Sequence, residues 1–163
     1  MPENAEIFER LIQDHNVHRD LFARLQEIDG ETPERRKLFT QLTKELKSHA
    51  SAEEQALYST MMRKPETTDE TRHSVAEHHD IEVALNDLAA TEMTSSEWDE
   101  KFDQLRDRYL HHIEEEEDEH FPDFDNYLTA EDESHMRVVF ERRKKAEREE
   151  AEVTPELKED AKE

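Results

Sequence analysis

The sequence predicts an all-α fold, an antiparallel up-down-up-down four-helix bundle with an additional C-terminal helix. Apolar residues recur at three- and four-residue spacing in four successive segments between residues 7 and 121, the pattern of helices with one buried face. The loops between these segments are short, and short loops place successive helices antiparallel. The second half of this region also repeats the first at an offset of 63 positions.

Composition sets the expected domain organisation. The chain has 163 residues, of which 33% are hydrophobic and 41% are charged. So low a hydrophobic fraction, with a net charge of -23, is typical of disordered chains, but a disordered chain has no reason to keep helical periodicity. We expect residues 1–128 to form the bundle, 129–153 to form a charged amphipathic helix, and 154–163 to be disordered.

The first two helices follow from their apolar stripes and end signals. The first stripe runs from Ile7 to Ile28, and Gly30, the one glycine of the chain, should terminate this helix. Thr32-Pro33 should open the second helix, with the threonine as cap and the proline in its first turn. Lys64-Pro65 should end it.

The third helix should begin near Thr68, with its apolar stripe between Val75 and Leu88. Thr94-Ser-Ser-Glu97 reads as a capping box that opens the fourth helix, and Pro122 should close that helix.

The C-terminal segment predicts a fifth helix. Thr129 should cap it, and Met136, Val139 and Phe140 should pack across the bundle. The basic run Arg142–Lys145 is followed by the mostly acidic run Glu147–Glu150, which is typical of a solvated helix. This helix is a candidate surface for a protein partner.

The internal repeat selects six candidate metal ligands. His49-x-x-x-Glu53 recurs as His112-x-x-x-Glu116, and in each half a further histidine stands 34 positions before the first. All of them lie within the apolar stripe of their helix, so antiparallel packing should bring them to one level of the bundle. The predicted ligands are His15, His49, Glu53, His78, His112 and Glu116.

Nitrogen and oxygen ligands restrict the metal. The chain has no cysteine, which excludes thiolate zinc sites and cysteine-bound iron–sulfur clusters. Imidazole with carboxylate suits iron or manganese, and zinc also fits. The two-fold repeat indicates two ions, with Glu53 and Glu116 as bridging carboxylates. His18, His73 and His120 remain open as a fifth nitrogen ligand, whereas His79, His111 and Glu54 are interpreted as surface groups.

The charge excludes two classes of partner. A chain with a net charge of -23 is repelled by nucleic acid and by anionic membranes. No stretch reaches the roughly 20 apolar residues of a membrane span, and the start lacks the basic and apolar regions of a signal peptide. We expect a cytoplasmic protein.

These motifs resemble the hemerythrin-like family, helical domains with a histidine, histidine, glutamate cation-binding pattern. The resemblance covers residues 7 to about 122. The motifs that carry it are Asp14-His15, His49-Ala-Ser-Ala-Glu53-Glu54, Glu77-His78 and His112-Ile-Glu-Glu-Glu116-Glu117, with Phe121-Pro122 after the last. It implies a non-haem centre of two iron ions with an oxo or hydroxo bridge, which binds dioxygen, nitric oxide or peroxide.

The chain departs from the oxygen-carrying members of that family. Those members have a fifth histidine one turn before the third-helix histidine and a later aspartate on the fourth helix, whereas this chain has Ser74 at the first position and Glu116 on the fourth helix. The resemblance therefore favours sensing, scavenging or storage over bulk transport. The alternatives are a di-iron peroxidase or catalase-like enzyme, and a structural bundle with zinc or no metal. Ferritin-like oxidases would need Glu-x-x-His motifs on two helices, a spacing that does not fit.

Overall fold

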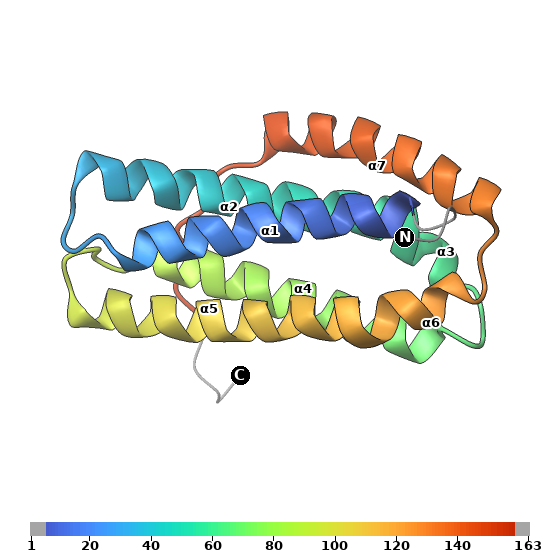
Figure 1. Ribbon diagram of the computed structural model, residues 1–163. Helices are drawn as coiled ribbons and strands as arrows, with labels where there is room; N and C mark the ends of the chain where they lie inside the picture. The colour runs from blue at the N-terminus through green and yellow to red at the C-terminus, as the bar shows by residue number, and fades with distance from the viewer. Residues whose placement is uncertain (1–5, 159–163) are drawn as a thin grey trace.

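The computed structural model describes residues 6–158, and in this part of the chain every regular element is a helix (Figure 1). The predicted all-α fold is confirmed. The long helices are α1 (Glu6–Gln26), α2 (Pro33–Glu53), α4 (Thr68–Ala89), α5 (Ser96–Glu115) and α7 (Ala130–Glu150). Short elements extend two of them: the π-helical turn η1 (Glu54–Tyr58) with α3 (Ser59–Met61), and the π-helical turn η2 (Glu116–His120) with α6 (Phe121–Asp125).

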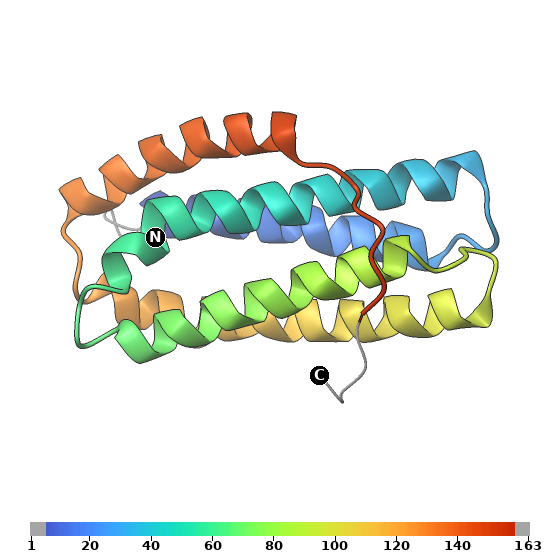
Figure 2. The same ribbon diagram turned by 180° about the vertical axis from the view of Figure 1, so that it is seen from behind.

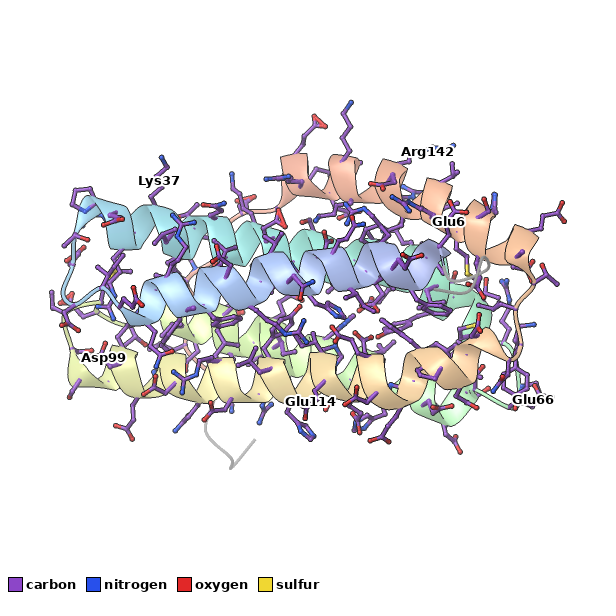
Figure 3. All side chains as sticks on the ribbon, in the orientation of Figure 1. Glu6, Lys37, Glu66, Asp99, Glu114 and Arg142 are labelled. Carbon is purple, nitrogen blue, oxygen red and sulfur yellow. The ribbon has the colours of Figure 1, made fainter. Side chains whose placement is uncertain are left out.

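Helices α1, α2, α4 and α5 lie side by side, and each runs opposite to the one before it in the chain (Figures 1 and 2). Helix α1 contacts α2 and α5, and α4 contacts α2 and α5. Helix α7 packs across α1 and α2. The charged side chains of Lys37, Asp99, Glu114 and Arg142 point away from the bundle (Figure 3). Within the described residues, no helix is both long enough and apolar enough to span a membrane.

Two of the predicted helix starts are confirmed by their caps. The hydroxyl of Thr32 accepts a hydrogen bond from the backbone N–H of Arg35, and Pro33 is the first residue of α2. Thr129 and Asp132 form a reciprocal capping box at the start of α7. Such caps satisfy backbone N–H groups that the first helical turn leaves unpaired.

Three predicted helix boundaries were wrong in detail. Helix α1 ends at Gln26, and Gly30 lies in the following loop with a positive φ of 74°. Ser95, not Thr94, caps α5 by accepting from the backbone N–H of Trp98. The chain stays helical through Pro122. This proline lies in the first turn of α6, a position at which the absence of a backbone N–H is tolerated.

The apolar core consists of two clusters, one at each end of the bundle. In the first cluster, residues of α1, α2, α4 and α5 pack together around Phe22, Leu42 and Trp98. The second joins the start of α1 to the ends of α2 and α6 and to α7, around Leu11, Met61 and Phe140. The six predicted ligands lie where the two clusters meet. The few apolar residues thus pack mainly toward the two ends of the bundle, and the polar centre lies between them.

The two π-helical turns occupy nearly the same place in each half of the repeat: η1 begins directly after Glu53, whereas η2 begins at Glu116 itself, one residue earlier in the repeat. A π turn bonds residue i to residue i+5 and so inserts one residue into the helix, which rotates everything beyond it. Tyr58 and Phe121, which an uninterrupted α-helix would turn away from the site, are instead buried beside it. Sequence periodicity did not predict these turns.

The predicted disordered tail concerned residues 154–163. The structure describes 151–158 as extended chain, and residues 159–163 lie outside the described part. Two backbone hydrogen bonds join this segment to α4, from the N–H of Glu156 to the carbonyl of Asn86 and from the N–H of Lys158 to the carboxylate of Asp87. Val153 packs against the first apolar cluster. We call residues 151–158 the strap.

A buried carboxyl group marks the junction of α7 with the bundle. Glu133 is fully buried, at 0% exposed, and neither of its carboxyl oxygens has a hydrogen-bond partner. Burial and the neighbouring carboxylate of Asp125 raise the pKa of Glu133 to about 9. The folded protein therefore holds this group as the neutral acid at neutral pH.

We expect Glu133→Gln to stabilise the protein above neutral pH. The pKa of Glu133 is raised on folding, so folding must take up a proton at any pH between about 4.5 and 9, and glutamine removes that cost. The free energy of unfolding should rise by about 1–2 kcal/mol at pH 8, and the gain should vanish below about pH 4.5. Urea unfolding of the wild type, Glu133→Gln and the exposed control Glu131→Gln at both pH values measures this, and a gain that is independent of pH would contradict it.

Candidate metal centre

The six predicted ligands converge from four helices in the middle of the bundle. His15 comes from α1, His49 and Glu53 from α2, His78 from α4, His112 from α5, and Glu116 opens η2. All six side chains are buried, between 0% and 7% exposed. The apolar stripes position them, because each lies on the face that its helix buries.

The six groups form two matched sets of two imidazoles and one carboxylate. In one set, the Nε2 atoms of His49 and His78 lie 3.4 and 3.3 Å from Oε1 of Glu53. In the other, the Nε2 atoms of His15 and His112 lie 3.4 and 3.6 Å from Oε1 of Glu116. One set joins α2 to α4 and the other joins α1 to η2 and the end of α5.

These distances fit donors of a shared cation better than hydrogen bonds. They exceed the usual N–H to O separation of about 2.7–3.2 Å. Two donors that are each about 2.1 Å from one ion stand roughly 3.0–3.5 Å apart at ordinary coordination angles. The buried donor atoms without any hydrogen-bond partner include Nε2 of His15 and His49, both oxygens of Glu53 and Oε1 of Glu116. Such groups are costly to bury unless an ion satisfies them, so the donor set fits a metal.

The outer nitrogen of each imidazole is held by a second carboxylate. In all four pairs that carboxylate lies on a different helix or π turn from the imidazole, and the spacing of the pairs obeys the same repeat. The Nδ1 contacts are His15 to Glu117 at 2.7 Å, His49 to Asp14 at 2.8 Å, His78 to Glu54 at 2.9 Å and His112 to Glu77 at 2.7 Å. Each contact fixes the ring orientation and directs Nε2 inward, as carboxylates behind metal-bound histidines do.

The interpretation of Glu54 as a solvated surface group was wrong. The adjacent residue Glu53 faces the centre of the bundle, but Glu54 lies at the flank of α2 where α4 approaches, and there it meets His78. The signal that could have identified it was present in the repeat. Glu54 and Glu117 are equivalent positions, and each orients a histidine of another helix.

Comparison with known proteins identifies the family of this chain. The hemerythrin HHE cation binding domain matches residues 6–124. The chain belongs to the hemerythrin HHE cation-binding family. Its resemblance to this family, inferred from the motifs, is confirmed, and cation binding is what the family shares.

A solved structure has the same fold as this hemerythrin HHE domain. The crystal structure of a hemerythrin HHE cation binding domain-containing protein from Mycobacterium kansasii has 21% sequence identity and a TM-score of 0.80, covering 89% of this chain and 88% of that one. At this identity the likeness concerns the fold alone. A search of curated proteins found no match.

The three histidines left open as further ligands occupy different surroundings in this HHE domain. His73 is exposed, with its Nε2 3.0 Å from Glu115. His120 is buried, and its Nδ1 lies 3.1 Å from the hydroxyl of Ser74. His18 is fully buried beside His49, with ring centres 5.1 Å apart, and its Nε2 has no partner. His18 is therefore the one of the three whose free nitrogen lies near the candidate ligands.

His18 also belongs to a group with Asp14 and His49 whose polar atoms lie within 4.8 Å of one another. That group is better explained by hydrogen bonding than by a metal. Asp14 already accepts from Arg10 at 2.6 Å, from Lys144 at 2.6 Å and from His49. Although burial opposes ionisation, His49 and Lys144 hold the pKa of Asp14 well below its usual range. The outer carboxylate is thus ionised and its oxygens are occupied.

Helical periodicity did not identify one group that lies within the site. The phenol of Tyr58, on η1, donates a hydrogen bond to Oε2 of Glu116, and its ring stacks on His78 with centres 5.4 Å apart. In the other half, Phe121 stacks on His15 at the equivalent position. At this position the two halves therefore differ by one hydroxyl group, and the phenol oxygen is a seventh donor within reach of the centre.

In the metal-free protein, nearby carboxylates raise the pKa of two imidazoles of the centre. Burial alone would lower the pKa of His15, but the carboxylates of Glu116 and Glu117 outweigh it and raise that pKa to about 9. For His78, Glu53 and Glu54 likewise overcome burial and raise the pKa to about 10. The buried carboxylates thus attract positive charge whether it arrives as protons or as a cation.

Metal binding to this HHE domain should therefore release protons. At pH 7 the imidazoles of His15 and His78 are protonated in the metal-free protein, and a cation must displace both protons. Affinity should rise with pH until about pH 9–10, by roughly ten-fold per pH unit for each proton displaced. Titration calorimetry with Zn²⁺ in two buffers of different ionisation enthalpy counts the protons. Release of no protons at pH 7 would contradict the expectation.

Proposed function

We propose that this HHE domain, built as an up-down-up-down four-helix bundle, holds a non-haem centre of two iron ions. One ion would be bound by His15, His112 and Glu116 and the other by His49, His78 and Glu53. The observation that carries the proposal is the matched pair of histidine, histidine, glutamate sets, each with donor atoms 3.3–3.6 Å apart. The second oxygen of Glu53 has no partner, which leaves it free to bridge.

The donor chemistry favours iron. Neutral imidazoles with carboxylates, and a phenol nearby, suit ions of intermediate hardness, and manganese or zinc would also fit. Iron adds the capacity to exchange electrons with a small ligand. The proposed role is to bind or respond to dioxygen, nitric oxide or peroxide, as in sensing, scavenging or iron storage, with the protein donors leaving coordination positions for that ligand.

One observation favours a second role, decomposition of peroxide by a di-iron enzyme. The phenol of Tyr58 lies at the centre of the site, on Glu116, and carries a proton at neutral pH because burial and the two buried carboxylates raise its pKa. A positioned phenol can donate a proton to a departing oxygen atom. Measured consumption of hydrogen peroxide by the iron-loaded protein separates this role from simple binding.

The ligand set predicts a difference between two adjacent histidines. His112→Ala removes an Nε2 donor at the centre, whereas His111→Ala changes an exposed side chain one position earlier on the same helix. We expect about two iron ions per chain in the wild type and in His111→Ala, and a loss of at least one ion in His112→Ala. Elemental analysis of purified protein provides the measurement, and equal iron content in the two variants would refute the ligand set.

The absence of a carrier-like histidine predicts irreversible behaviour toward oxygen. Ser74 stands where oxygen-carrying members have a histidine, and in this protein its hydroxyl is engaged with His120. We expect the reduced, iron-loaded protein to be oxidised by dioxygen without releasing it again under vacuum. Absorbance spectra recorded after mixing and again after evacuation test this, and recovery of the reduced spectrum would establish carriage instead.

A further inference from the structure

A cavity of about 590 Å³ lies between α2 and α4 and reaches the candidate metal centre. Its lining includes His49 and His78, the two imidazoles that face Glu53. Three other hollows in the described residues, of about 470, 350 and 250 Å³, are lined by none of the six candidate ligands. This cavity therefore connects solvent with the α2–α4 half of the centre.

The cavity is strongly acidic. Its lining carries one lysine, Lys47, and five glutamates, which are Glu54, Glu82, Glu147, Glu150 and Glu152. The ammonium of Lys47 is committed to Asn86 at 2.9 Å and to the backbone carbonyl of Glu152 at 3.1 Å. A concave surface lined by one sign of charge concentrates ions of the opposite sign within it. Here that charge favours cations and disfavours anions.

One of the carboxylates that line the cavity also contacts a buried imidazole of the metal centre. Glu54 lines the cavity and also holds Nδ1 of His78 at 2.9 Å, so it belongs to both the cavity and the centre. His49, also in the lining, is 2% exposed and its Nε2 has no hydrogen-bond partner. The same cavity thus holds exposed carboxylates and a buried nitrogen that can bind a cation.

The strap forms one wall of this cavity. Figure 2 shows the chain leaving α7 and crossing α2 and α4. Ala151, Glu152 and Thr154 line the cavity from this side. Lys47, which binds the carbonyl of Glu152, holds the strap against α2 and is also the one lysine of the lining.

We propose that this cavity is the route by which divalent cations reach the paired metal centre, and that its carboxylates speed their arrival. The inference rests on the proposed function, because it requires a centre that binds metal. It assigns a role to Glu82 and Glu150, which touch none of the candidate ligands, and to Lys47, which opposes them.

The test measures how fast metal-free protein takes up Co²⁺, by stopped-flow absorbance at low salt. The double variant Glu82→Gln/Glu150→Gln should take up Co²⁺ about three- to ten-fold more slowly than the wild type, with the same final stoichiometry. Added salt should slow the wild type and shrink this difference. Lys47→Met should be faster than the wild type, because it removes the positive charge of the lysine from the lining and loosens the strap.

The matched control is Glu100→Gln/Glu114→Gln, which makes the same change in net charge at exposed positions of α5 that do not line the cavity. Its uptake rate should equal that of the wild type. Equal rates in all four proteins, or equal slowing in both double variants, would overturn the route while leaving the metal centre intact. Failure of the wild type to bind Co²⁺ at all would overturn the proposed function and the route together.

Discussion

The structure depends on one constraint, the burial of imidazole and carboxylate groups at the centre of a bundle that has little apolar surface to spare. Polar atoms in such a place need partners. The outer nitrogens find them in four carboxylates. Nε2 of His15 and His49, both oxygens of Glu53 and Oε1 of Glu116 find none among the described residues. The two apolar clusters lie on either side of this centre, so the same helices that form the core also hold the donors in place.

The two halves of the centre are related by the sequence repeat but are not equivalent. The histidines, their carboxylates and the π turns all recur, whereas Tyr58 stands opposite Phe121 and His18 stands opposite Ile81. The phenol and the extra imidazole are both buried. A cation on one side of the centre would therefore have different neighbours from a cation on the other side.

Helix α7 is part of the support of the centre. Lys144 is buried, and its ammonium binds Asp14 at 2.6 Å and Glu45 at 3.1 Å. Asp14 in turn holds His49. Removing one partner from a buried ion pair leaves an uncompensated charge, which is strongly unfavourable. The fifth helix therefore adds a positive charge beside two buried carboxylates of the bundle, and the strap that follows it borders the cavity at the same half.

The sequence alone determined the helical segments, two of the helix caps and the six central residues, because helical periodicity states which face of each helix is buried and the repeat distinguishes His78 and His112 from their neighbours. Only the tertiary structure decided the roles of Glu54, Tyr58 and Lys144. Glu54 lies off the buried face and meets His78 where α4 approaches. Tyr58 reaches the centre through a π turn that changes the phase of its helix. Lys144 meets Asp14 across 130 positions of sequence. Periodicity describes one helix at a time, and these contacts depend on what a neighbouring helix presents.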